Sequence, residues 1–163
     1  MKPRNMLRIV AMVALAAALP ATAIGQSLKS ALVGSWLVTS VVDQYDSGEK
    51  VNNWGNAKGN LTFDAAGRFS QIIVGDAQPA LKTADPRKPD APVVAYFGTY
   101  TVDEAKKAVS TSIEAASYSA RVGVSFPSSI EVQGDVMRLV GAVRKDQKGE
   151  FRPILELKRA PAL

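Results

Sequence analysis

The chain contains no cysteine and no histidine among its 163 residues. Without cysteine no disulfide can stabilise the fold, so buried apolar side chains and hydrogen bonds must hold it together. Without cysteine and histidine, the usual protein ligands of zinc, haem and iron–sulfur clusters are missing. Catalysis by Ser-His-Asp or Cys-His sets is excluded for the same reason. From these absences we expect no metal site and no cofactor, and the sequence assigns no catalytic residue.

Apart from its first residues, the chain also lacks a strong excess of positive or negative charge. The formal net charge is +5, but Lys2, Arg4 and Arg8 supply three of the positive charges with no acidic residue near them. The rest of the chain carries 17 basic against 15 acidic residues, a formal charge of +2. This balance gives no indication of a nucleic acid or an anionic membrane as a partner.

The first 25 residues have the layout of a secretory signal. Their positive start leads into an unbroken apolar run over Ile9–Leu19, which is too short for a comfortable permanent membrane anchor. Pro20 ends the run, and small residues then allow cleavage after Ala23 or after Gly25. We expect residues 26–163 to be the mature domain, in a bacterial periplasm or secreted. An uncleaved anchor is the alternative.

Strand patterns dominate the mature chain, after one short helical turn within Gln26–Val33 for which Ser27 is the candidate N-cap. Two tight turns carry glycine, at Gly67 and Gly134, where a positive φ is needed. Eight segments rich in β-branched and aromatic residues are predicted as strands: 35–43, 60–64, 68–74, 93–102, 107–115, 129–132, 136–143 and 152–159.

The connections between these segments decide the architecture. No helix of useful length separates the strands, so antiparallel pairing of consecutive strands is favoured over parallel pairing. Closure removes the exposed edges of such a sheet, and eight strands enclose either a side-chain core or one small ligand. We therefore predict an all-β, single-domain, eight-stranded antiparallel up-and-down barrel. Two long connections, 44–58 and the proline-rich 75–92, are candidates for functional loops or for solvated spacers.

Three blocks of the sequence resemble the lipocalin-like domain family of bacteria and fungi, within the calycin superfamily. The blocks are Leu32–Val41, which contains the Gly-x-Trp signature, Gly59–Ser70 and Ala95–Asp103. The resemblance runs in order from Leu32 to Arg159. It implies a calycin-type barrel, but it implies no settled activity.

The chain also departs from this family in two places. The segment 75–92 is proline-rich where family members often carry a short acidic helix. The predicted fifth strand has Ser110, Thr111 and Ser112 where the family tends to have histidine. Any family chemistry that needs this histidine is therefore in doubt for this chain.

Three residues are expected to close one end of the barrel. The resemblance implies that Trp36, next to Gly34, plugs the end and that a basic residue from the last strand lies across it. Arg159 shares its strand face with Leu155 and Leu157, so it can reach the interior. A guanidinium over an indole ring contributes about 0.5–2 kcal/mol. This role is structural.

The candidate ligand-binding residues are Tyr96, Tyr100, Phe69, Met137 and Arg138. Tyr96 and Tyr100 share one strand face, where their rings and hydroxyls suit an amphipathic ligand. Arg138 would pair with a carboxylate if it pointed inward. The alternatives are a filled core or the outer belt of the barrel for the aromatic residues and a solvated face for Arg138.

The sequence favours a protein that binds a small hydrophobic or amphipathic molecule. One alternative is a metal-independent isomerase or cyclase that uses barrel tyrosines with carboxylates such as Glu114, Glu131 or Glu156. A second is a filled barrel that acts by contact with another envelope protein. A hollow apolar interior would support binding, and an inward carboxylate beside a tyrosine would support an enzyme. Ligand identity, oligomeric state and the inward strand face are left open.

Overall fold

The computed structural model describes residues 26–76, 85 and 87–161. The predicted signal at 1–25 and part of the connection 75–92 lie outside the described residues. One short helix, α1 (Leu28–Leu32), precedes the strands, and Ser27 caps it by accepting a 3.1 Å hydrogen bond from the Ser30 amide. The predicted N-terminal turn is confirmed. Within the described part of the chain, no helix is long and apolar enough to cross a membrane.

Ten strands follow α1 in the described residues, with one short 3-10 helix between the sixth and the seventh. Their bounds are β1 (Gly34–Tyr45), β2 (Lys50–Val51), β3 (Lys58–Phe63), β4 (Arg68–Val74), β5 (Val93–Asp103), β6 (Ala108–Ala116), η2 (Ser119–Arg121), β7 (Ser125–Gln133), β8 (Val136–Gly141), β9 (Arg144–Asp146) and β10 (Gly149–Arg159).

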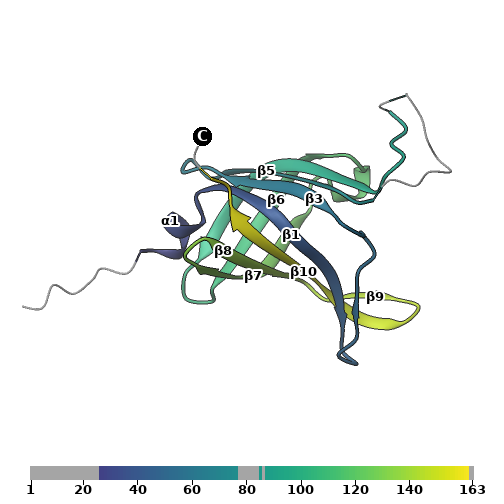
Figure 1. Cartoon of the computed structure of the whole chain (residues 1–163). Coiled ribbons are helices and arrows are strands. Elements are labelled where there is room, and N and C mark those ends of the chain that lie inside the picture. The colour runs from purple at the N-terminus through teal and green to yellow at the C-terminus, as the bar shows by residue number, and fades with distance from the viewer. Residues whose placement is uncertain (1–25, 77–84, 86, 162–163) are drawn as a thin grey trace, which may run out of the picture.

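Eight of these strands form a closed antiparallel barrel (Figure 1). The order around the barrel is β1, β3, β4, β5, β6, β7, β8 and β10, and β10 pairs back onto β1 from Trp36↔Arg159 to Tyr45↔Phe151. The up-and-down barrel predicted from the sequence is confirmed. The two short strands, β2 and β9, extend the ladder beyond the barrel, β2 beside the end of β1 and β9 beside the start of β10.

Alternation along the strands separates an inward face from an outward face. On β4, Phe69 and Ile73 are buried while Ile72 is 53% exposed. On β5, Tyr100 is buried while Phe97 is 48% exposed. The glycine turns behave as predicted, because Gly67 and Gly134 have φ values of +90° and +57°.

One end of the barrel is closed by α1 and by Trp36, which is fully buried. The Trp36 indole Nε1 donates a 2.8 Å hydrogen bond to the Leu32 carbonyl, so the ring is fixed beneath the helix. The carboxylate of Glu104, in the β5–β6 turn, accepts from the amides of Leu28 and Lys29 at 2.8 and 2.9 Å and holds the start of α1. Figure 1 shows α1 at this end and β9 at the opposite end.

Most strand ends lie within two residues of the predicted ones, but β7 and β10 begin four and three residues earlier than predicted. β7 begins at Ser125, four residues before the predicted start at residue 129, and at Pro127 it pairs only with β6. β8 ends at Gly141, where a Cβ would lie 2.7 Å from Pro153 Cγ. The chain then forms β9, which the sequence analysis did not predict.

Candidate functional site

A cavity of about 300 Å³ occupies the part of the barrel away from α1. Its wall is aliphatic, and each of six strands contributes one branched side chain to it. These side chains are Val41, Leu61, Ile73, Val109, Leu139 and Leu155. Because they come from β1, β3, β4, β6, β8 and β10, the hollow lies on the barrel axis. The volume is at the lower end of the range of about 300–1,000 Å³ that is typical of ligand pockets.

Four aromatic rings separate the cavity from the filled half of the barrel. The Phe63 ring lies edge-on to Tyr100, with ring centroids 5.1 Å apart, and is stacked with Phe69 at 6.2 Å. Phe69 in turn contacts the edge of Tyr96 at 5.9 Å. Such pairs contribute about 0.5–1.5 kcal/mol each beyond their buried area. Phe63 and Tyr96 line the cavity, whereas Phe69 and Tyr100 pack behind them.

Tyr96 supplies the phenol of the cavity. Burial raises its pKa to about 12, although the positive charges of Arg121 and Arg144 act in the opposite direction. The hydroxyl is therefore protonated at neutral pH and can donate a hydrogen bond to a ligand. Gln71, opposite Tyr96 in the β4–β5 ladder, lines the same side of the cavity.

Arg121, at the end of η2, brings a positive charge to the cavity. Its guanidinium carbon lies 4.1 Å from the centroid of the Phe126 ring and 5.6 Å from that of Tyr118. Its Nε also donates to the Tyr118 hydroxyl. Two aromatic faces and one hydrogen bond thus hold a half-buried guanidinium in place, and further N–H groups remain for a ligand.

Arg144, on β9, is the second arginine at the cavity. It keeps contact with solvent, but partial burial at the barrel end and the like charge of Arg121 lower its pKa. Tyr118, Tyr96 and Asp43 act in the opposite direction. An arginine remains charged under ordinary conditions, so Arg144 brings a second positive charge to the lining of the cavity.

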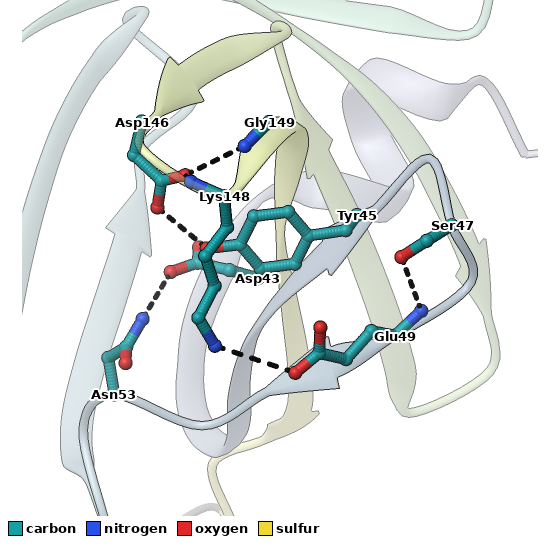
Figure 2. A network of polar contacts seen from close by, with 8 residues as sticks. All are labelled: Asp43, Tyr45, Ser47, Glu49, Asn53, Asp146, Lys148 and Gly149. Atoms are coloured by element: carbon teal, nitrogen blue, oxygen red, sulfur yellow. Dashed lines mark hydrogen bonds and ion pairs between the residues drawn. The ribbon is translucent and has the colours of Figure 1, made fainter.

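Asp43 is the one acidic residue among those that line the cavity in the described structure. Its Oδ2 accepts a 2.9 Å hydrogen bond from the Asn53 side chain, as Figure 2 shows. This bond connects the end of β1 to the connection that carries Trp54, whose ring also lines the cavity.

A polar network fixes β9 against β1 (Figure 2). The Tyr45 hydroxyl donates a 2.6 Å hydrogen bond to Asp146 Oδ2, and this bond raises the pKa of Tyr45 to about 12 while it lowers that of Asp146. Asp146 Oδ1 accepts from the amides of Lys148 and Gly149 at 2.8 and 3.2 Å. Lys148 also pairs with Glu49 at 3.5 Å. Because β9 begins with Arg144, the network positions that arginine.

The structure brings one of the five predicted ligand residues to the cavity, namely Tyr96. Phe69 and Tyr100 are buried behind the cavity, and Met137 is fully buried in the core. Arg138 lies on the outer face, because the residues on either side of it point inward, and its cross-strand neighbours are Glu131 and Glu156. Ligand contact by any of the five stays a prediction.

The three barrel-closing residues do come together. The Arg159 guanidinium carbon lies 4.2 Å from the centroid of the Trp36 ring, which is the predicted contact. Gly34 has a φ of +131°, and a Cβ on it would lie 2.8 Å from Arg159 Nη1. Arg159 also donates to the carbonyls of Val33 and Ala31 at 3.0 and 2.8 Å, so it joins α1 to the last strand.

Sequence reasoning missed both arginines of the cavity. Arg121 and Arg144 lie in segments that the prediction treated as connections, where strand alternation assigns no face. Two aromatic residues near Arg121 in the sequence, Tyr118 and Phe126, were the available signal, since arginine often packs on such rings.

The barrel and its cavity place the protein in the class of lipocalin-like proteins. Residues 33–160 match the model of the lipocalin-like domain family, and the chain belongs to this family. Among solved structures, the crystal structure of a lipocalin-like protein from Bacteroides uniformis ATCC 8492 is similar, with 17% sequence identity and a TM-score of 0.44. The similarity covers 80% of this chain and 99% of that one. Among curated proteins, none matches the sequence.

Proposed function

We propose that the protein binds one small amphipathic molecule in the hollow half of its barrel. The observation that carries this proposal is the cavity of about 300 Å³, which is walled by aliphatic side chains from six strands. Burial of a ligand's apolar body against such a wall contributes roughly 25 cal/mol per Å² of apolar surface removed from water. Polar groups gathered at Tyr96, Arg121 and Arg144 would receive the polar end of the ligand.

Binding is favoured over catalysis by the positions of the carboxylates. Glu114, Glu131 and Glu156, which the enzyme hypothesis needed inside the barrel, are exposed. The acid that does line the cavity, Asp43, accepts a hydrogen bond from Asn53. The phenol of Tyr96 has a pKa raised to about 12, which makes it a poor base at neutral pH.

Binding is also favoured over a role through surface contact alone. A barrel that acted only through its outer surface would gain stability from a core filled along its whole length, since voids forfeit packing interactions. Here the side-chain core fills the half near Trp36, and the other half is hollow and apolar.

A dye titration with two matched variants tests the proposal. Phenylnaphthylamine is small, uncharged and fluorescent in apolar surroundings, so it should bind the wild-type protein with increased fluorescence. Ile73→Trp adds an indole inside the cavity and should abolish binding. Ile72→Trp places the same indole on the outer face of the same strand, where Ile72 is 53% exposed, and should leave binding unchanged. Equal binding by both variants would place the dye outside the cavity and refute the proposal.

We further propose that the chain is exported and that the mature protein works in a bacterial periplasm or outside the cell. The support is the sequence of residues 1–25 described above. When the full chain is produced in a bacterium, the intact mass of the periplasmic protein should correspond to a start immediately after Ala23 or Gly25. A full-length mass in the membrane fraction would instead indicate an uncleaved anchor.

A further inference from the structure

We propose that the ligand is an amphiphile with a single carboxylate, and that Arg121 and Arg144 bind this head group while the aliphatic wall holds the tail. This inference rests on the proposed function, because it names the chemical class that the same cavity would take.

Neither arginine forms an ion pair in the described part of the chain. The ion pairs of the structure engage other basic residues: Arg68, Arg87, Lys106, Lys148 and Arg159. The Arg121 side chain contacts two rings and a hydroxyl, and the Arg144 side chain forms no hydrogen bond or ion pair within the described structure. Two guanidinium groups beside an apolar cavity therefore keep donors that an anion can satisfy.

The arginines are held where they are, although they repel one another. Arg121 is fixed by the Phe126 ring, and the like charge of Arg121 contributes to the lowered pKa of Arg144. Arg144 is the first residue of β9, which the Tyr45–Asp146 hydrogen bond ties to β1. A prearranged pair of like charges is unfavourable alone and becomes favourable when an anion binds between them.

The charge balance points to a single negative charge on the ligand. The cavity is lined by two arginines and one aspartate, Asp43, which leaves one formal positive charge. A carboxylate would neutralise it, and the planar carboxylate suits two-point binding by guanidinium groups. The protonated phenol of Tyr96 would add one neutral donor, and the small volume limits the tail to a short chain or a compact ring.

Paired probes with the same tail test this inference. Displacement of phenylnaphthylamine by decanoate and by decanamide gives two affinities that differ only in the head group. We expect the wild-type protein to bind decanoate about tenfold more tightly than decanamide, as for hydrogen bonds to a charged group. Arg144→Gln and Arg121→Gln should each remove most of this preference, because the affinity for decanoate should fall much more than the affinity for decanamide.

Lys145→Gln is the matched control, because it removes the same charge from the adjacent residue of β9, which does not line the cavity. It should keep the preference for decanoate. Circular dichroism checks that each variant is folded. If Arg121→Gln does not fold, the result for Arg144→Gln alone decides the outcome.

Two results would overturn the head-group assignment. One is equal affinity of the wild-type protein for decanoate and decanamide; the other is loss of the preference in Lys145→Gln as large as that in Arg144→Gln. In both cases the binding proposal stands as long as the dye binds and Ile73→Trp blocks it. Failure of the dye to bind at all would instead refute the proposed function.

Discussion

Arg159 connects several elements at the closed end of the barrel. Its guanidinium covers the Trp36 ring at 4.2 Å, donates to two carbonyls at the end of α1, and pairs with Asp135 of the β7–β8 turn at 3.2 Å. One side chain therefore holds the helix, the first strand, the last strand and a turn together.

Replacement of Arg159 by alanine should lower the free energy of unfolding by about 2 kcal/mol, because it removes a cation–π contact and leaves two carbonyls without their donors. Urea denaturation measures the change. Arg152→Ala, at an exposed position of the same strand, serves as the control and should change the free energy of unfolding only slightly. An unchanged midpoint for Arg159→Ala would show that these contacts contribute nothing measurable.

Gly34 is required by both its conformation and its surroundings. A side chain at a φ of +131° is strained, and its Cβ would lie 2.8 Å from Arg159 Nη1. Gly34→Ala should therefore destabilise the protein by roughly 1–3 kcal/mol. Gly149→Ala is the comparison, since φ is +133° there and no atom lies within 4 Å of the added Cβ. Equal losses of melting temperature would mean that contact with Arg159 adds nothing to the strain.

The sequence was informative about these residues where strand periodicity applies. The family resemblance implied the contact between Arg159 and Trp36, and strand alternation, which gives Arg159 the same face as Leu157, is consistent with it. The same rule could not place Arg121 or Arg144, because η2 and β9 are short segments whose orientation depends on tertiary packing.

Among the elements, β9 is the one whose position matters most for the cavity. It has three residues and pairs only with the start of β10, so its own hydrogen bonds are few. The Tyr45–Asp146 bond and the Tyr45–Phe151 ring contact, at 5.4 Å between centroids, supply the remaining restraint.

Tyr45→Phe should loosen β9 without removing the ring contact. Amide hydrogen exchange of residues 144–146 should become faster, and the preference for decanoate over decanamide should decrease because Arg144 is less firmly placed. Phenylnaphthylamine affinity should stay the same, since the aliphatic wall is intact. Unchanged exchange and unchanged preference would mean that the hydrogen bond does not position Arg144.

The barrel strands themselves could largely be predicted from the sequence, whereas β2 and β9 could not. Alternating apolar residues and glycine turns at Gly67 and Gly134 specify the long strands locally. The two short strands have no such alternation; they exist because the ends of β1 and β10 project beyond the barrel and offer unpaired backbone groups.

At the scale of the whole molecule, the barrel divides into a filled half and a hollow half. Trp36, Met137 and Leu157 are fully buried near α1, and the aromatic group from Tyr100 to Tyr96 marks the boundary. The filled half supplies stability without any disulfide, and the hollow half has space for a ligand.

Alkaline pH should destabilise the molecule through its buried phenols. The pKa of Tyr96 is raised from 10.0 to about 12, so its contribution is fully present below pH 10.0 and is lost as the pH rises toward 12. Tyr96→Phe cannot titrate and should lose less stability over this interval, by up to about 2 kcal/mol. Urea denaturation at the two ends of the interval compares the variants. Identical losses would mean that the Tyr96 phenol ionises as easily in the folded protein as in the unfolded chain.

Native mass spectrometry of the protein, purified from its source cells without denaturation, tests most directly whether the hollow half holds a small molecule. We predict a non-covalent adduct on the wild-type protein that persists in Ile72→Trp and is absent from Ile73→Trp. A wild-type protein that carries no adduct, or an adduct of the same abundance on Ile73→Trp, would contradict the account.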